Sequence, residues 1–180
     1  MSSAHHGRLR SDPLPESILA RRIAAYLLDV TLLFAVLAPA NFLVQRAVPG
    51  QATTPPEIWH ALLLGFSLPS WLYFTLSDVS KAGASVGKRC LGLAVLAANG
   101  HPPRWPRAVL RTALKLLPWE TVHVAAFALG DASFELRGSQ SALLVTANLL
   151  ALVWLAVAVR SRGMRSVHDV VTGTRVLRAR

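Results

Sequence analysis

Residues 23–44 read IAAYLLDVTLLFAVLAPANFLV, an apolar run whose only charged residue is Asp29. As an α-helix this run is about 33 Å long, which matches the roughly 30 Å hydrocarbon core of a bilayer. Residues 58–76 and 142–159 form two further runs of similar length that contain no lysine, arginine, aspartate or glutamate. The three runs predict transmembrane helices.

The composition of the 180-residue chain agrees with a membrane protein. Hydrophobic residues make up 53% and charged residues 16%, against roughly 25% charged residues in a soluble protein. The 19 lysines and arginines exceed the 9 acids, giving a net charge of +10. These cations flank apolar runs and do not gather with stacking aromatic residues, so we expect no nucleic-acid partner. The single cysteine, Cys90, forms no disulfide within the chain.

Residues 113–129 form a weaker apolar run, because they include Lys115, Glu120 and His123. Two interpretations are open. The run is a fourth transmembrane helix, or residues 104–117 form an amphipathic helix on the membrane surface, followed by a short dip into the bilayer.

The distribution of positive charge favours the fourth crossing. With four crossings, all of the 19 lysines and arginines except Arg46 and Arg137 lie on one side of the membrane. The positive-inside rule then predicts that both termini are cytoplasmic. Without the crossing at residues 113–129, the C-terminal arginines would lie outside.

The predicted fold is therefore an all-α membrane protein with four transmembrane helices, at about 23–44, 58–76, 113–129 and 142–159. Residues 1–17, rich in Ser, Pro and charge, predict a disordered cytoplasmic tail. Residues 18–178 are expected to form a single transmembrane domain. The short apolar segments Leu93–Ala97 and Thr174–Leu177 predict a small two-stranded ribbon on the cytoplasmic side.

Acids within apolar runs are candidate functional residues. Asp29 is expected about two helical turns deep in the bilayer, where a charge costs about 2.5–3.5 kcal/mol and requires a partner or water. Asp29 either locks helix packing or serves function. Glu120 and His123 share one helical face and are candidate ligands for an ion or proton. We predict no metal site there, because too few matching ligands occur on other helices.

The segment Gly83–Leu93, GASVGKRCLGL, lacks the spacing of a phosphate-binding loop. The chain shows no nucleophile elbow, paired catalytic carboxylates or zinc-ligand spacing, so we expect neither an enzyme nor a cofactor. Basic residues of the middle loop are instead predicted to bind anionic lipid headgroups or a cytoplasmic partner; they are Lys88, Arg89, Arg104, Arg107 and Arg111.

Three motifs together resemble the RDD family of small bacterial membrane proteins, which is named for one arginine and two aspartates. Arg22 and Asp29 match the family's first arginine and first aspartate. A second motif, Ser85-Val-Gly87-Lys88 with Gly92-Leu93, resembles its Thr-x-Gly-Lys loop with serine in place of threonine. His168-Asp169 resembles its closing motif and supplies the second aspartate. One departure is the segment Gly163–Ser166, where the family commonly carries Arg-Gln.

The resemblance implies a multi-pass protein of the bacterial cytoplasmic (inner) membrane that transports a ligand; a few family members have been linked to sodium/proton exchange. Under this hypothesis Asp29 and Glu120 line a polar cavity, with Arg22, His168 and Asp169 at its cytoplasmic mouth. Because four helices enclose little space, we expect a homo-oligomer or a membrane partner protein. The alternative is a scaffold or accessory subunit that does not transport and binds lipid or a partner through its basic loop.

Overall fold

The computed structural model describes residues 16–47, 50, 52–128 and 137–179. The tail predicted over residues 1–17 lies outside the described residues as far as residue 15, and the first helix begins at Glu16. In chain order the elements are α1 (Glu16–Ala47), α2 (Pro55–Leu62), η1 (Leu63–Ser67), α3 (Leu68–Val79), α4 (Val86–Cys90), β1 (Leu93–Ala97), α5 (Trp105–His123), η2 (Val124–Ala128), α6 (Gly138–Arg160), α7 (Val167–Val171) and β2 (Thr174–Arg178).

Among the described residues, three helices are long and apolar enough to cross a membrane. They are residues 18–47 of α1, residues 55–79 of α2, η1 and α3 together, and α6. The predicted spans 23–44, 58–76 and 142–159 lie within them. The turns η1 and η2 are π-helical and continue the α-helix before them without a break.

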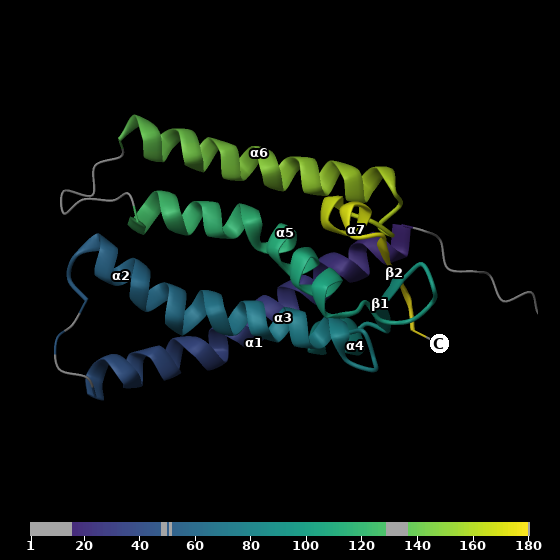
Figure 1. The fold of residues 1–180 in the computed structure, drawn as a ribbon, viewed down its shortest axis with the longest axis horizontal. Helices are drawn as coiled ribbons and strands as arrows, with labels where there is room; N and C mark the ends of the chain where they lie inside the picture. The colour runs from purple at the N-terminus through teal and green to yellow at the C-terminus, as the bar shows by residue number, and fades with distance from the viewer. Residues whose placement is uncertain (1–15, 48–49, 51, 129–136, 180) are drawn as a thin grey trace, which may run out of the picture.

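Helix α5 with η2 contains the remaining predicted span, 113–129, as far as residue 128. It carries too many charges to be identified as a span by composition, namely Arg107, Arg111, Lys115 and Glu120. Figure 1 nevertheless shows that α5 runs alongside α6 over most of the length of α6. The amphipathic segment predicted at residues 104–117 is therefore the first part of a longer continuous helix and does not end at Leu117.

The predicted two-stranded ribbon is confirmed. Strands β1 and β2 pair antiparallel, with Val95 opposite Val176. Both valines are fully buried against Ala25 of α1. Figure 1 shows the ribbon, α4 and α7 gathered at one end of the bundle, which we call the sheet end. The sheet end is where segments far apart in the sequence meet.

The long helices bury little of their apolar surface within the chain. A small core of Leu33, Phe74 and Leu116 joins α1, α3 and α5. Most apolar side chains of α1 and α6 are exposed, Leu43 and Leu152 among them. Apolar surface of this extent is not left open to water by soluble proteins, so lipid or another membrane protein must cover it.

Candidate functional site

A chain of buried ion pairs joins five elements at the sheet end. Asp169 of α7 accepts hydrogen bonds from Arg22 of α1 at 2.7 Å and from Arg111 of α5 at 2.8 and 2.9 Å. Arg111 also donates to Asp78 at the end of α3. Lys88 of α4 donates to the other oxygen of Asp78 at 3.0 Å. Cations and carboxylates therefore alternate along this network, in the order Arg22, Asp169, Arg111, Asp78 and Lys88.

The short helix α7 holds Asp169 in place. Ser166 precedes the helix, and its backbone N–H donates to Asp169 at 2.9 Å, so this carboxylate also caps its own helix. Burial alone would raise the pKa of Asp169, but the charges of Arg111 and Arg22 hold that pKa well below its usual range. Asp169 is therefore an anion that ties together the N-terminal helix, α5 and the C-terminal segment.

His168 lies beside Asp169 and completes the closing motif. Its Nε2 is 3.4 Å from the Nη2 of Arg22, while its Nδ1 is buried without a hydrogen-bond partner. Burial, which outweighs the attraction of Asp169, holds the pKa of His168 well below its usual range, and the charges of Arg111 and Arg22 act in the same direction. His168 is therefore a neutral imidazole with one ring nitrogen unsatisfied.

The departure from the family motif, Gly163–Ser166, has a clear structural role here. The carbonyl of Gly163 accepts a hydrogen bond from Arg22 at 2.9 Å. Gly163 has a φ of 82°, and a Cβ placed on it would lie 2.4 Å from the backbone nitrogen of Leu19 in α1. Only glycine allows this loop to reach the helix so closely.

Asp29 does not belong to the ion-pair network. Its carboxylate accepts hydrogen bonds from Tyr73 at 2.6 Å, from Ser85 at 2.5 Å and from the backbone N–H of Gly87 at 2.7 Å. Ser85 is the residue that precedes α4. Asp29 thus caps the first turn of α4 from a neighbouring helix, where a negative charge is favourable.

Two glycines of the loop motif have different roles. A Cβ on Gly87 would lie 2.1 Å from the carbonyl oxygen of Ala25, so Gly87 is required for the contact between α4 and α1. Gly92 has a φ of 63° and open space around it, so it serves the turn from α4 into β1. Lys88, between them, is buried, and burial lowers its pKa from the ordinary value even though Asp78 opposes that shift.

The five basic residues predicted to bind lipid or a partner fall into two groups. Arg89, Arg104 and Arg107 are exposed. Lys88 and Arg111 are buried, Arg111 being only 1% exposed, and both are paired with carboxylates. The charges of Lys88 and Arg111 are therefore not presented to headgroups, contrary to that expectation.

A cavity of about 430 Å³ lies between α1, α5, α6 and α7 beside the network. Its lining includes cations from three helices, Arg22, Lys88 and Arg111 of the network and Lys115 of α5, together with Asp29. His168 also lines it, while the rest of the lining is mainly apolar. The structure thus brings Arg22, Asp29 and His168 together at one cavity, with Asp169 directly behind Arg22.

Comparison with known proteins identifies the chain. The RDD family model matches residues 17–173, which include Arg22, Asp29 and Asp169. The chain belongs to the RDD family. Neither the curated proteins nor the solved structures include a match to this RDD protein.

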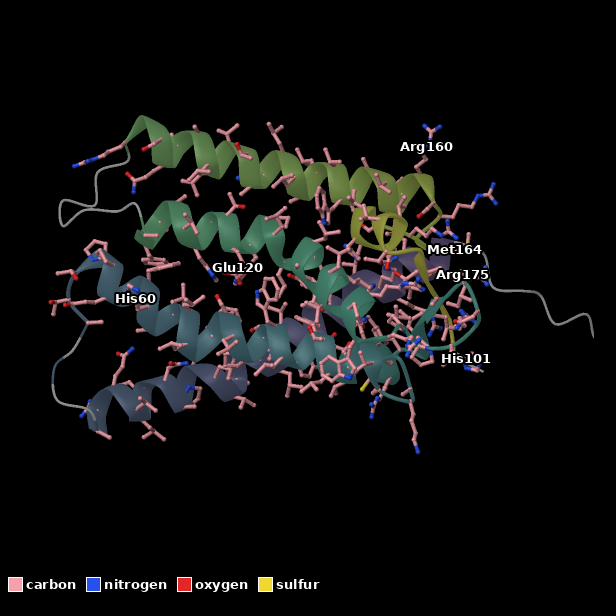
Figure 2. All side chains as sticks on the ribbon, in the orientation of Figure 1. His60, His101, Glu120, Arg160, Met164 and Arg175 are labelled. Carbon is pink, nitrogen blue, oxygen red and sulfur yellow. The ribbon has the colours of Figure 1, made fainter. Side chains whose placement is uncertain are left out.

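Glu120 and His123 form a separate polar group in the RDD protein, away from the cavity. Glu120 accepts hydrogen bonds from Ser67 at 3.0 Å and Trp71 at 3.1 Å, and His123 lies 3.4 Å from it. Figure 2 shows Glu120 in the middle of the bundle, far from Arg175 at the sheet end. Glu120 borders a small void of about 20 Å³ that the main cavity does not include, so Asp29 and Glu120 do not share one cavity. Within the described residues no three His, Cys, Asp or Glu side chains gather as a metal site.

Sequence reasoning missed Asp78, the acid that holds Lys88 and Arg111. It follows the second apolar run by two residues, so its position in the sequence lies outside the predicted span. Its signal was present: an acid at the end of a membrane helix on a strongly basic side is a candidate counter-ion for buried cations.

Proposed function

We propose that this RDD family protein is a transporter of the bacterial cytoplasmic membrane and moves a small ligand by way of the cavity between α1, α5, α6 and α7. The cavity carries this proposal. Its volume of about 430 Å³ lies in the range of small-molecule sites. Its charged lining sits among helices that are apolar on their outer faces, where ionisable residues are characteristic of substrate pathways.

The proposed topology has four crossings with both termini in the cytoplasm. Helix α5 and the π-helical turn η2 that continues it have 24 residues together, about 36 Å of helix and enough to cross. Arg160 and Arg175 lie at the sheet end, while His60 lies at the opposite end (Figure 2). Two cations of the described residues lie at the helix ends away from the sheet end, namely Arg46 at the end of α1 and Arg137 at the start of α6. This asymmetry supports a cytoplasmic sheet end.

The charge of the cavity favours an anionic ligand over sodium. The carboxylates of Asp78 and Asp169 are taken up by ion pairs, and that of Asp29 accepts three hydrogen bonds. A sodium ion would have to displace these donors. An anion would meet cations that already face the cavity.

A chain of this size does not enclose a transport path alone, so other protein surfaces must complete the walls of that path. Helix α1 contacts α4 and η1 and packs on α5 through Leu33, whereas the cavity lies between its first half, residues 19–29, and helices α5 and α6. We therefore propose that a second copy, or another membrane protein, covers the apolar outer faces of α1 and α6. Movement of α1 against α5 and α6 would then open the cavity to either side in turn.

Flux in proteoliposomes tests the proposal. Sodium/proton exchange is measured with a pH dye, and uptake is measured separately for inorganic phosphate and octanesulfonate. The variants are Asp29→Asn and Lys115→Gln, with Lys81→Gln as the control because Lys81 is exposed and outside the cavity. We expect anion uptake above that of empty liposomes, lost in Lys115→Gln and kept in Lys81→Gln. Sodium/proton exchange that depends on Asp29 would support transport with a cation as the ligand.

The second candidate is a scaffold or accessory subunit, favoured by one observation. Arg89, Arg104 and Arg107 are exposed near the sheet end and are free to attract anionic headgroups or an acidic partner. Absence of all flux from folded wild-type protein, with loss of vesicle or partner binding when these three arginines are changed to glutamate, would favour this role over transport.

A further inference from the structure

We infer that the cavity binds an amphiphile with one anionic head group and an apolar chain, the head lying against Lys115 and His168 and the chain between α1 and α6. This inference names the ligand class for the transport proposed above, but binding itself does not require transport. It depends on three features of the cavity: its charge, its unsatisfied groups and its apolar opening.

The basic and acidic side chains around the cavity are unequal in number. Three carboxylates accompany four basic side chains, which are Arg22, Lys88, Arg111 and Lys115. Asp78 and Asp169 pair with the first three of these, and Asp29 is the third carboxylate. Lys115 has no carboxylate partner in the described residues. Its Nζ lies 3.1 Å from the centre of the Phe74 ring and 5.1 Å from that of Tyr26, a contact with aromatic faces alone. A single negative charge in the cavity would neutralise this lysine.

A buried imidazole with one unsatisfied ring nitrogen borders the same cavity. His168 lines it, is 7% exposed, and its Nδ1 has no hydrogen-bond partner. Nε2 lies 3.4 Å from both Nη2 of Arg22 and Oδ2 of Asp169. When Nε2 accepts from Arg22, Nδ1 carries the ring proton and is a donor, and when Nε2 donates to Asp169, Nδ1 is an acceptor. Buried polar atoms without a partner are rare in native structures and indicate a missing ligand or water. An anionic oxygen that reached Nδ1 would satisfy it in the first of these tautomers.

The walls of the cavity suit a hydrocarbon chain. Ile23 and Leu27 of α1 and Leu155 of α6 line the cavity and are also exposed, so it opens on the apolar outer surface between these helices. Trp119 and Trp154 form further parts of the lining. A soluble anion such as phosphate would leave these walls without contacts, whereas an amphiphile fills them and keeps its head at the charged end.

Quenching of tryptophan fluorescence tests this inference, because Trp119 and Trp154 line the cavity. The full chain is placed in phosphatidylcholine nanodiscs at pH 8, and four brominated probes are titrated. Dibromostearate and its methyl ester share a chain and differ in head charge. Phosphatidylglycerol and phosphatidylcholine with dibrominated chains form the matching pair of phospholipids.

We expect saturable quenching by at least one anionic probe and about tenfold weaker quenching by its neutral counterpart, as for the loss of one charge-assisted hydrogen bond. Quenching by dibromostearate alone would assign a single-chain carboxylate, and quenching by phosphatidylglycerol alone a phospholipid. Equal quenching by charged and neutral probes of wild-type protein would overturn the inference without any variant. Displacement by inorganic phosphate at similar concentration would also overturn it, in favour of a soluble anion.

Variants of Lys115 test whether the anionic head group binds at this residue. Lys115→Gln should lose the preference for the anionic probe, whereas Lys115→Arg and the exposed control Lys81→Gln should keep it. A preference that survives Lys115→Gln in folded protein would contradict the site. The two proposals fail separately: saturable, charge-dependent quenching without flux would refute transport alone, and sodium flux without such quenching would refute the ligand class alone.

Discussion

The two halves of the bundle are built on different principles. At the sheet end, five charged side chains from five elements form one alternating network, and all of them except the half-buried Arg22 are buried. In the opposite half the helices are held by sparse contacts, such as the amide of Asn41 on the carbonyl of Gly65 and the acceptor Glu120. The comparison shows that specific polar contacts between elements are concentrated at the sheet end, whereas the other half mainly exposes apolar side chains that suit lipid.

This difference has an energetic consequence. An apolar helix in lipid gains little from packing on another apolar helix, because the lipid is equally apolar. A buried network of charges instead strongly favours one arrangement, since each unpaired member would remain buried without compensation. Disruption of the sheet end should therefore cost far more than comparable changes in the opposite half.

The largest effect is expected from Arg111→Ala. This change leaves Asp78 with Lys88 alone and Asp169 with Arg22 alone, and removal of one partner from a buried pair costs about 3–5 kcal/mol. Arg107→Ala is the matched control, because Arg107 lies one turn earlier on α5 and is exposed. Its cost should be within about 0.5 kcal/mol. Unfolding by SDS in mixed micelles measures both, and equal costs would mean that the network does not stabilise the fold.

The next largest loss of stability is expected at the contact between α4 and α1. Gly87→Ala places a methyl group 2.1 Å from the carbonyl oxygen of Ala25, so α4 must move away from Asp29. Overpacking of this kind costs about 1–3 kcal/mol or more. Gly92→Ala is the control in the same loop, because it meets no neighbour and adds only the strain of a positive φ, about 1–2 kcal/mol.

Thermal unfolding with the intrinsic fluorescence of the protein separates these two glycine variants. Gly87→Ala should also weaken the hydrogen bonds of Ser85 and Gly87 to Asp29, which hydrogen exchange at α4 would reveal. If Gly92→Ala proves the more damaging, the tight approach of α4 to α1 is not what holds this end together.

The apolar helices of the bundle could be predicted from the sequence almost entirely. The lengths of the runs at residues 23–44, 58–76 and 142–159 placed the three apolar helices, since a bilayer demands about 20 apolar residues for each crossing. At the sheet end, the ribbon also followed from two short apolar segments, Leu93–Ala97 and Thr174–Leu177. Helix α5 was harder to predict as a transmembrane helix, because its charged residues argue against a membrane span unless their partners are known.

The sheet end could be predicted only in part, because its partners are distant in sequence. The motif residues Arg22 and Asp29 are on one helix, yet Arg22 pairs with Asp169 and Asp29 caps α4. Nothing local to Arg111 distinguishes it from the exposed Arg107, since only the fold turns Arg111 towards Asp78. The choice between a buried cation and a headgroup ligand is therefore a tertiary property, not one of residue type or spacing.

The smallest effect concerns pH and again separates the two halves. His168 is buried and neutral in the folded protein, because its pKa lies well below the usual value. Below about pH 6.5 the unfolded chain takes up a proton at this residue that the folded protein does not, so stability should fall as pH decreases. For a single proton the slope of this loss cannot exceed about 1.4 kcal/mol per pH unit.

His168→Gln should remove this dependence while unfolding like the wild type between pH 7 and 8, where the histidine of the unfolded chain is also neutral. The free energy of unfolding at pH 8, 7, 6 and 5 measures the difference. The pKa of Asp169 is also lowered, but its contribution is lost only below about pH 3.8, outside this window. A variant that keeps the full wild-type slope would show that the pH sensitivity lies elsewhere. Loss of the slope in His168→Gln would instead place the pH sensitivity in the sheet end, at His168.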